Sequence, residues 1–87
     1  MYEVNLLDEA RTTLAGLAPD ALKSLAELVD LLAIQPYAGR LYGRPGSDLR
    51  TIALADGRIL AVWLVLEDQQ RVEVLRILWL GDMDGLR

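Results

Sequence analysis

Runs of apolar residues in the second half of the chain predict a three-stranded antiparallel meander. Residues with strong β-propensity dominate three stretches, Leu49 to Leu54, Ile59 to Leu66 and Val72 to Leu80. The segment between the first two stretches contains Asp56-Gly57, a pair that favours the positive φ angles of a tight β-turn. The middle run has no polar residue on either face, which is typical of a central strand covered on both sides.

Apolar spacings of three and four in the first half predict two helices. The first is N-capped by Asp8 and ends near Leu17. The second starts at Ala18-Pro19-Asp20 and is stopped by Pro36. Its wide apolar stripe consists of Leu22, Leu25, Ala26, Leu28, Val29, Leu32 and Ala33. The pair forms a helical hairpin that needs a flat sheet to lie on.

Two further segments complete the predicted fold. Residues 2–6 alternate in polarity and predict a short first strand that runs into the first helix. Residues 37–47 are rich in glycine, proline, arginine and tyrosine, which predicts a connection and no regular element. The expected fold class is α+β, with a short N-terminal strand and a two-helix hairpin packed on the three-strand meander. The sheet face away from the helices needs cover from the chain's tail, a partner or a dimer mate.

Length and composition limit the kinds of site available. We expect one domain over residues 1–87, because this length does not support two ordinary cores. The sequence has no Cys, which removes disulfides and thiolate metal sites, and no His, which removes the commonest general base. No metal site and no cofactor are predicted. An acidic start and the lack of a long apolar run predict a cytoplasmic protein without membrane contact.

Hydrophobic content and charge favour a protein partner. The hydrophobic fraction of 53% is high for a domain of this size, which indicates a full core or a covered surface. The net charge of -4 opposes general attraction to nucleic acid. Only residues 40–58 are locally basic, with four Arg against Asp48 and Asp56.

The arginines of the strands are the candidate catalytic residues. If Arg50 and Arg58, which flank the first hairpin, share a face, they could clamp a phosphate or a carboxylate; the alternative is two solvated edge residues. A period of two places Arg76 on the face of Val72, Val74 and Leu78, where it is either partly buried and paired with an acid or faces an empty groove.

The candidate binding residues are Arg40, Tyr42 and Arg44, which make a basic, aromatic contact loop or an ordinary loop surface. The remaining aromatic and acidic residues are expected to be structural or solvated. Trp63 and Trp79 are predicted to fill the core, and Tyr2 and Tyr37 to pack with wet hydroxyls. Turn acids such as Glu67 are expected to be solvated charges.

The order of these elements resembles the RelE/ParE superfamily of toxins from bacterial type II toxin-antitoxin pairs. The resemblance spans nearly the whole chain and consists of short motifs in the family's order. These are Tyr2-Glu3-Val4, the helix end Leu31 to Pro36, the loop Leu41-Tyr42-Gly43, the pair Leu49-Arg50, the strand Gly57 to Trp63 and the last strand Val74 to Ile77. The family's central-strand Arg matches either Arg58 or Leu60, depending on the register.

The resemblance implies a toxin-like protein that a cognate antitoxin binds and neutralises. Members that cut messenger RNA on the ribosome use basic and aromatic residues near the C-terminal end, where this chain has Trp79, Leu80, Gly81 and Asp82. This departure favours the ParE-like class, which binds DNA gyrase, over a ribosome-dependent endoribonuclease. A non-toxic interaction or regulatory subunit, or a self-associating homodimer, is the third alternative. Whether the protein is an enzyme stays open at this point.

Overall fold

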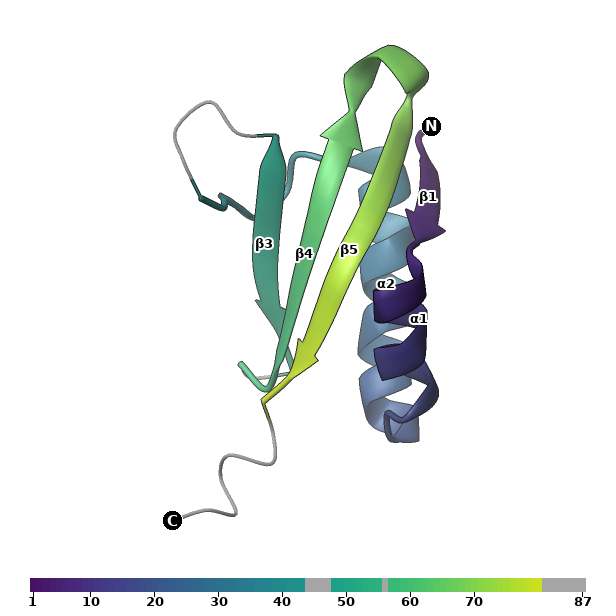
Figure 1. Cartoon of the computed structure of the whole chain (residues 1–87), viewed down its shortest axis with the longest axis vertical. Helices are drawn as coiled ribbons and strands as arrows, with labels where there is room; N and C mark the ends of the chain where they lie inside the picture. The colour runs from purple at the N-terminus through teal and green to yellow at the C-terminus, as the bar shows by residue number, and fades with distance from the viewer. Residues whose placement is uncertain (44–47, 56, 81–87) are drawn as a thin grey trace.

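A computed structural model describes residues 1–43, 48–55 and 57–80 and contains two helices beside a five-stranded mixed sheet (Figure 1). In chain order the elements are β1 (Glu3–Leu6), α1 (Asp8–Ala15), α2 (Pro19–Ile34), β2 (Arg40–Leu41), β3 (Leu49–Leu54), β4 (Ile59–Leu66), the 3-10 helix η1 (Glu67–Gln69) and β5 (Arg71–Trp79). The α+β class expected from the sequence is confirmed.

The sheet has the order β1-β5-β4-β3-β2. Strands β3, β4 and β5 form the predicted antiparallel meander, and β1 is added to β5 in parallel. The two-residue strand β2 pairs with β3 through Arg40 opposite Thr51 and Leu41 opposite Arg50. The expectation of no regular element between residues 37 and 47 is therefore wrong at this point, because two residues are too few to produce a periodic pattern.

Both helices lie on one side of the sheet (Figure 1). The predicted N-cap at Asp8 is wrong: Leu7 occupies the cap position, without a side-chain hydrogen bond, and Asp8 is the first helical residue. The reason is that β1 pairing continues to Leu7, whose N–H donates to the Val74 carbonyl at 3.0 Å. Asp8 then favours the helix through its dipole. Helix α1 ends at Ala15, before the expected Leu17.

Within the described residues, neither helix has both the length and the apolar character that are needed to cross a membrane.

The core is one apolar cluster between the helices and the sheet. Its buried residues are Ala10, Ala21, Leu25, Leu28, Leu32, Ile59, Ala61, Trp63, Val65, Val72, Val74 and Ile77. Trp63 is fully buried, and its Nε1–H donates to the Pro36 carbonyl at 2.8 Å. Trp79 is partly buried and packs against the cluster from outside, so the prediction that the tryptophans fill the core is confirmed for Trp63 only.

An irregularity in β5 changes the face to which its side chains point. Val62 pairs with Arg76 while the next residue, Trp63, pairs with Val74, so Leu75 is an extra residue in β5. Such a bulge reverses the alternation of side chains along a strand. Arg76 therefore lies on the opposite face from Val74, and the face predicted for Arg76 from a strict period of two is wrong.

Glu67 joins three segments at one end of the sheet. Its carboxylate accepts hydrogen bonds from the hydroxyl of Tyr2 at 2.5 Å, from the hydroxyl of Tyr37 and from Nε2 of Gln70 at 3.0 Å. The description of Glu67 as only a solvated charge is thus incomplete, since two of its three partners, Tyr2 and Tyr37, are distant in sequence. The hydrogen bond to Glu67 raises the pKa of Tyr37 to about 12, and both tyrosine hydroxyls lower the pKa of Glu67.

We predict that Gly39→Ala destabilises the fold by about 3 kcal/mol, through left-handed strain and a steric clash. Gly39 has φ +83°, and a Cβ there would lie 2.5 Å from the Thr51 carbonyl oxygen and 2.9 Å from the Trp63 ring. Gly43 is the matched control, because it has φ +88° but nothing within 4 Å of the added atom. Gly43→Ala should cost about 1 kcal/mol in denaturant unfolding. Equal losses in the two variants would contradict the close contact at Gly39.

We predict that the Tyr37 hydroxyl stays protonated at pH 11 in the native protein and ionises at that pH in Glu67→Gln. Because the folded pKa, about 12, lies above the ordinary value of 10, this contribution to stability is complete below pH 10 and is lost as the pH rises towards 12. The tyrosine ring ¹³C shift reports the ionisation directly. Ionisation of Tyr37 near pH 10 in both proteins would show that the hydrogen bond to Glu67 has little effect in solution.

Candidate functional site

The sheet face opposite the helices, here called the open face, is the largest candidate surface. Alternation along β4 places Leu60, Val62 and Leu64 on it, while Ala61 and Trp63 face the helices. Among the described residues no helix covers the open face (Figure 1). The sequence-based expectation that one side of the central strand needs further cover therefore holds for this part of the chain.

Charged side chains of both signs lie beside this apolar strip. The registers of β2 and β5 bring Arg40, Arg71, Glu73 and Arg76 to the same face as Leu60 and Leu64, and Thr51 and Leu78 lie there too. Leu78 is 37% exposed, whereas Val62 is buried. The open face thus combines apolar side chains with three guanidinium groups and the Glu73 carboxylate, a mixture that suits contact with proteins.

A shallow hollow of about 200 Å³ on the open face contains Arg76. Helix α1 runs along β5 beyond the end of β1 (Figure 1), and from there Glu9 reaches Arg76, with 3.1 Å between its Oε1 and the arginine Nε. Arg76 is thus paired with an acid, as one of the two alternatives drawn from the sequence held, but its side chain is 53% exposed and is not partly buried as that alternative required. The hollow is lined by Glu9, Tyr42, Leu49, Val62, Leu75 and Arg76.

Arg50 lies away from the open face. It pairs across the ladder with Trp63, so its side chain is on the helix side of the sheet. Its Nη1 donates to the Tyr37 carbonyl at 3.0 Å, and its guanidinium carbon lies 5.0 Å from the centre of the Tyr37 ring. These contacts give Arg50 a structural role in holding the segment after α2.

Arg58 lies in the turn before β4, at the other end of the β3–β4 hairpin from Arg50. Its guanidinium is 5.7 Å from the Trp79 ring centre and 4.0 Å from the Asp20 carboxylate. Its backbone carbonyl accepts the Leu80 N–H at 2.6 Å. The structure therefore does not bring Arg50, Arg58 and Arg76 together in one site. The sequence left open whether the family's central-strand Arg matches Arg58 or Leu60. Of these two residues, Leu60 lies within β4, on the open face, and Arg58 lies in the turn before it.

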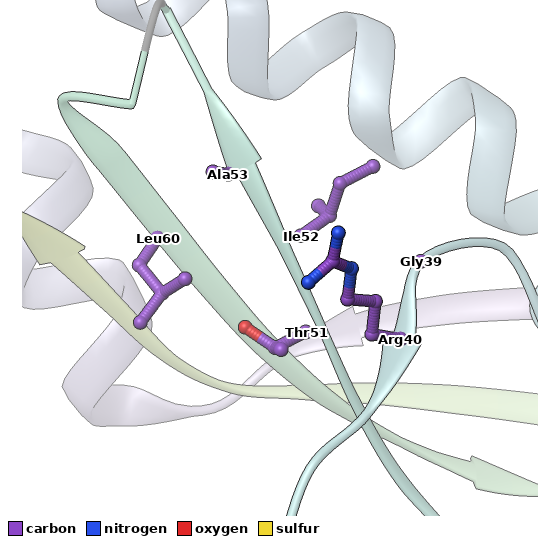
Figure 2. Close-up of a pocket in the computed structure, with 6 residues that line it drawn as sticks. All are labelled: Gly39, Arg40, Thr51, Ile52, Ala53 and Leu60. Carbon is purple, nitrogen blue, oxygen red and sulfur yellow. The ribbon is translucent and has the colours of Figure 1, made fainter.

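The binding residues predicted from the sequence separate into two hollows. Arg40 lines a hollow of about 650 Å³ at the outer edge of β3, together with Gly39, Thr51, Ile52, Ala53 and Leu60. Figure 2 shows the Arg40 side chain running beside β3. Tyr42 lines the hollow of Arg76 instead. The third predicted residue, Arg44, lies outside the described residues.

The chemistry available at these hollows is ionic and apolar. Each hollow offers one guanidinium that can bind a carboxylate or a phosphate oxygen. Among residues 1–43, 48–55 and 57–80, no cluster of three acidic side chains could hold a metal ion.

Two participants in these arrangements were not predicted from the sequence. Glu9 reaches Arg76 only because α1 runs beside β5, which no local pattern indicates. The junction at Glu67 likewise depends on Tyr2 and Tyr37 converging from distant positions. The one sequence signal for Glu9 was the alternative in which Arg76 is paired with an acid.

Comparisons with protein-family models and with curated proteins give no match. Solved structures do match, each over most of both chains. The intact Escherichia coli RelBE toxin-antitoxin complex aligns with a TM-score of 0.77 at 20% identity, covering 88% of this chain and 94% of that one. A RelBE toxin-antitoxin complex from Mycobacterium tuberculosis gives 0.76 at 21% identity, with 90% and 96% covered.

An archaeal RelE-RelB complex from Pyrococcus horikoshii aligns with a TM-score of 0.66 at 16% identity, covering 92% of this chain and 96% of that chain. At identities this low, the similarity shows a shared arrangement of helices and strands and does not extend to the site residues. The chain has the fold of RelE toxins.

Proposed function

We propose that this protein is the toxin-like component of a toxin-antitoxin pair of the RelE/ParE superfamily, neutralised by a cognate antitoxin, and that it acts on its target by protein contact. The observation that carries the proposal is the open face, an apolar strip beside charged side chains of both signs that no helix of the described chain covers. The fold adds support, since similar structures are RelE proteins solved in complex with their antitoxins.

Contact-based action is favoured over RNA cleavage by the placement of the charged groups. Of the three candidate catalytic arginines, Arg50 faces the helix side and Arg58 lies in a turn. Arg76 is on the open face but pairs with Glu9 at 3.1 Å. The chain has no His to move protons near neutral pH. Phosphate binding and proton transfer thus have few groups to support them.

A ribosome-dependent endoribonuclease is the second candidate, because one hollow contains both Arg76 and Tyr42. An arginine beside an aromatic ring is a combination that binds a phosphate and stacks on a base. For this activity Arg76 must leave Glu9, an exchange that is inexpensive for an exposed ion pair. Under the first candidate the target is a protein such as DNA gyrase, and under the second it is message on the ribosome.

We expect induced expression of the chain alone in a bacterial host to stop growth and to change plasmid supercoiling while translated messages stay intact. Cuts in translated messages that disappear in Arg76→Ala would instead establish the endoribonuclease. Normal growth with soluble, folded protein would contradict both toxic activities and leave a non-toxic binding subunit.

We further predict that Leu78→Glu removes growth inhibition while Leu31→Glu preserves it. The two leucines have nearly equal exposure, 37% and 36%, so a charge is tolerated similarly by the fold at each. Leu78 lies on the open face, and Leu31 lies on α2 on the other side of the sheet. A buried carboxylate at a protein interface weakens binding strongly, whereas one in water does not. Retained inhibition by Leu78→Glu, with thermal unfolding near that of the native protein, would exclude this part of the open face as the contact surface.

A further inference from the structure

Strand β3 has an outer edge that is only partly paired. The Tyr42 N–H donates to the Leu49 carbonyl at 3.0 Å, so the backbone groups of the odd-numbered residues in β3 point away from β4. The backbone groups of Thr51 point this way and face Arg40, the first residue of β2. Ala53 is the next residue with the same orientation, and it is exposed and lies beyond the start of β2. Its N–H and carbonyl therefore face the outer edge of the sheet without a strand partner in the described chain.

The backbone before Arg40 explains why β2 cannot cover Ala53. Gly39 has φ +83° and passes so close to the Thr51 carbonyl that a Cβ would lie 2.5 Å from its oxygen. The preceding Ala38 N–H donates back to the Gln35 carbonyl at 3.1 Å. The chain thus turns from the sheet towards the end of α2, and the edge stays open because of the covalent path of the chain.

The open edge lies at the hollow that Arg40 lines. This hollow, of about 650 Å³, has Ala53 and Thr51 in its wall together with Arg40 (Figure 2). Across the ladder, Ala53 shares its face with Leu60, whereas Ile52 points to the other side. An extended segment entering the hollow therefore meets unpaired backbone groups, apolar side chains and one cation.

Arg40 gives the hollow a charge preference. Its side chain is exposed, and it forms no ion pair with the described residues, in which the two ion pairs belong to Arg58 and Arg76. It lies on the same face as Thr51 and Ala53. A strand residue placed opposite Ala53 would point to this face too, close to Arg40.

We propose that the unpaired edge of β3 accepts an extended segment of a partner protein as an additional strand, with an acidic residue opposite Ala53 and apolar residues on either side of it. The acidic side chain would pair with Arg40, while its neighbours would lie on the helix side with Ile52 and Leu54. A second copy of this chain fits less well, since its own β3 would present only neutral side chains to Arg40. The identity of the partner as an antitoxin rests on the proposed function, but the edge site does not.

The test uses the whole ¹⁵N-labelled protein and capped synthetic pentapeptides. The probe is acetyl-Thr-Val-Glu-Val-Thr-amide, and the matched control has Lys in place of Glu. A third peptide carries an N-methyl group on the Glu amide, which cannot donate to a strand edge. We expect the Glu peptide to shift the Ala53 amide resonance and to bind about tenfold more tightly than the Lys peptide, and the N-methylated peptide to lose binding.

Charge reversal supplies the protein-side control. Arg40→Glu should make the Lys peptide the tighter ligand. Arg71→Glu, which alters an arginine on β5, three strands away from β2, should keep the preference of the native protein. Equal binding of the Glu and Lys peptides, retained binding of the N-methylated peptide, or shifts confined to β1 would overturn the proposal. Binding of the Glu peptide by a protein that does not inhibit growth would refute the proposed toxicity and leave the edge site standing.

Discussion

The indole of Trp63 lies at the middle of the central strand, fully buried, and its single polar group donates to the Pro36 carbonyl at 2.8 Å. A buried indole N–H without a partner would be costly, so this bond fixes the chain where it leaves α2. Three residues later Gly39 passes against the same ring, in a space that a Cβ would fill. The position of the helical hairpin over the sheet and the start of β2 both depend on this one contact.

The extra residue at Leu75 has an equally wide effect on the open face. In the part of β5 that precedes Leu75, the side chains of Val72 and Val74 point towards the helices. In the part that follows Leu75, the side chain of Ile77 points towards the helices. A regular strand would have buried Arg76 among the apolar residues of the core. The bulge keeps the core apolar and delivers a guanidinium to the opposite side, beside Glu9.

Most of the fold was predictable because its signals are local. The runs of β3 and β4 were expected at Leu49 to Leu54 and at Ile59 to Leu66, where the structure has them. The bulge and β2 were missed, since one extra residue and a two-residue strand leave no periodic trace. The site was predictable in composition but not in arrangement. The sequence singled out Arg76 and left open whether an acid pairs with it, whereas the choice of Glu9 depends on how α1 lies along β5.

The parallel pairing of β1 with β5 has a consequence for folding during synthesis. Glu3 lies opposite Arg71, so β1, the first of the described strands to be synthesised, has the last of them as its partner. Strand β5 also supplies Arg76 and Leu78 to the open face. While the chain is still growing, that face is therefore incomplete, and it is assembled only when β5 closes the sheet.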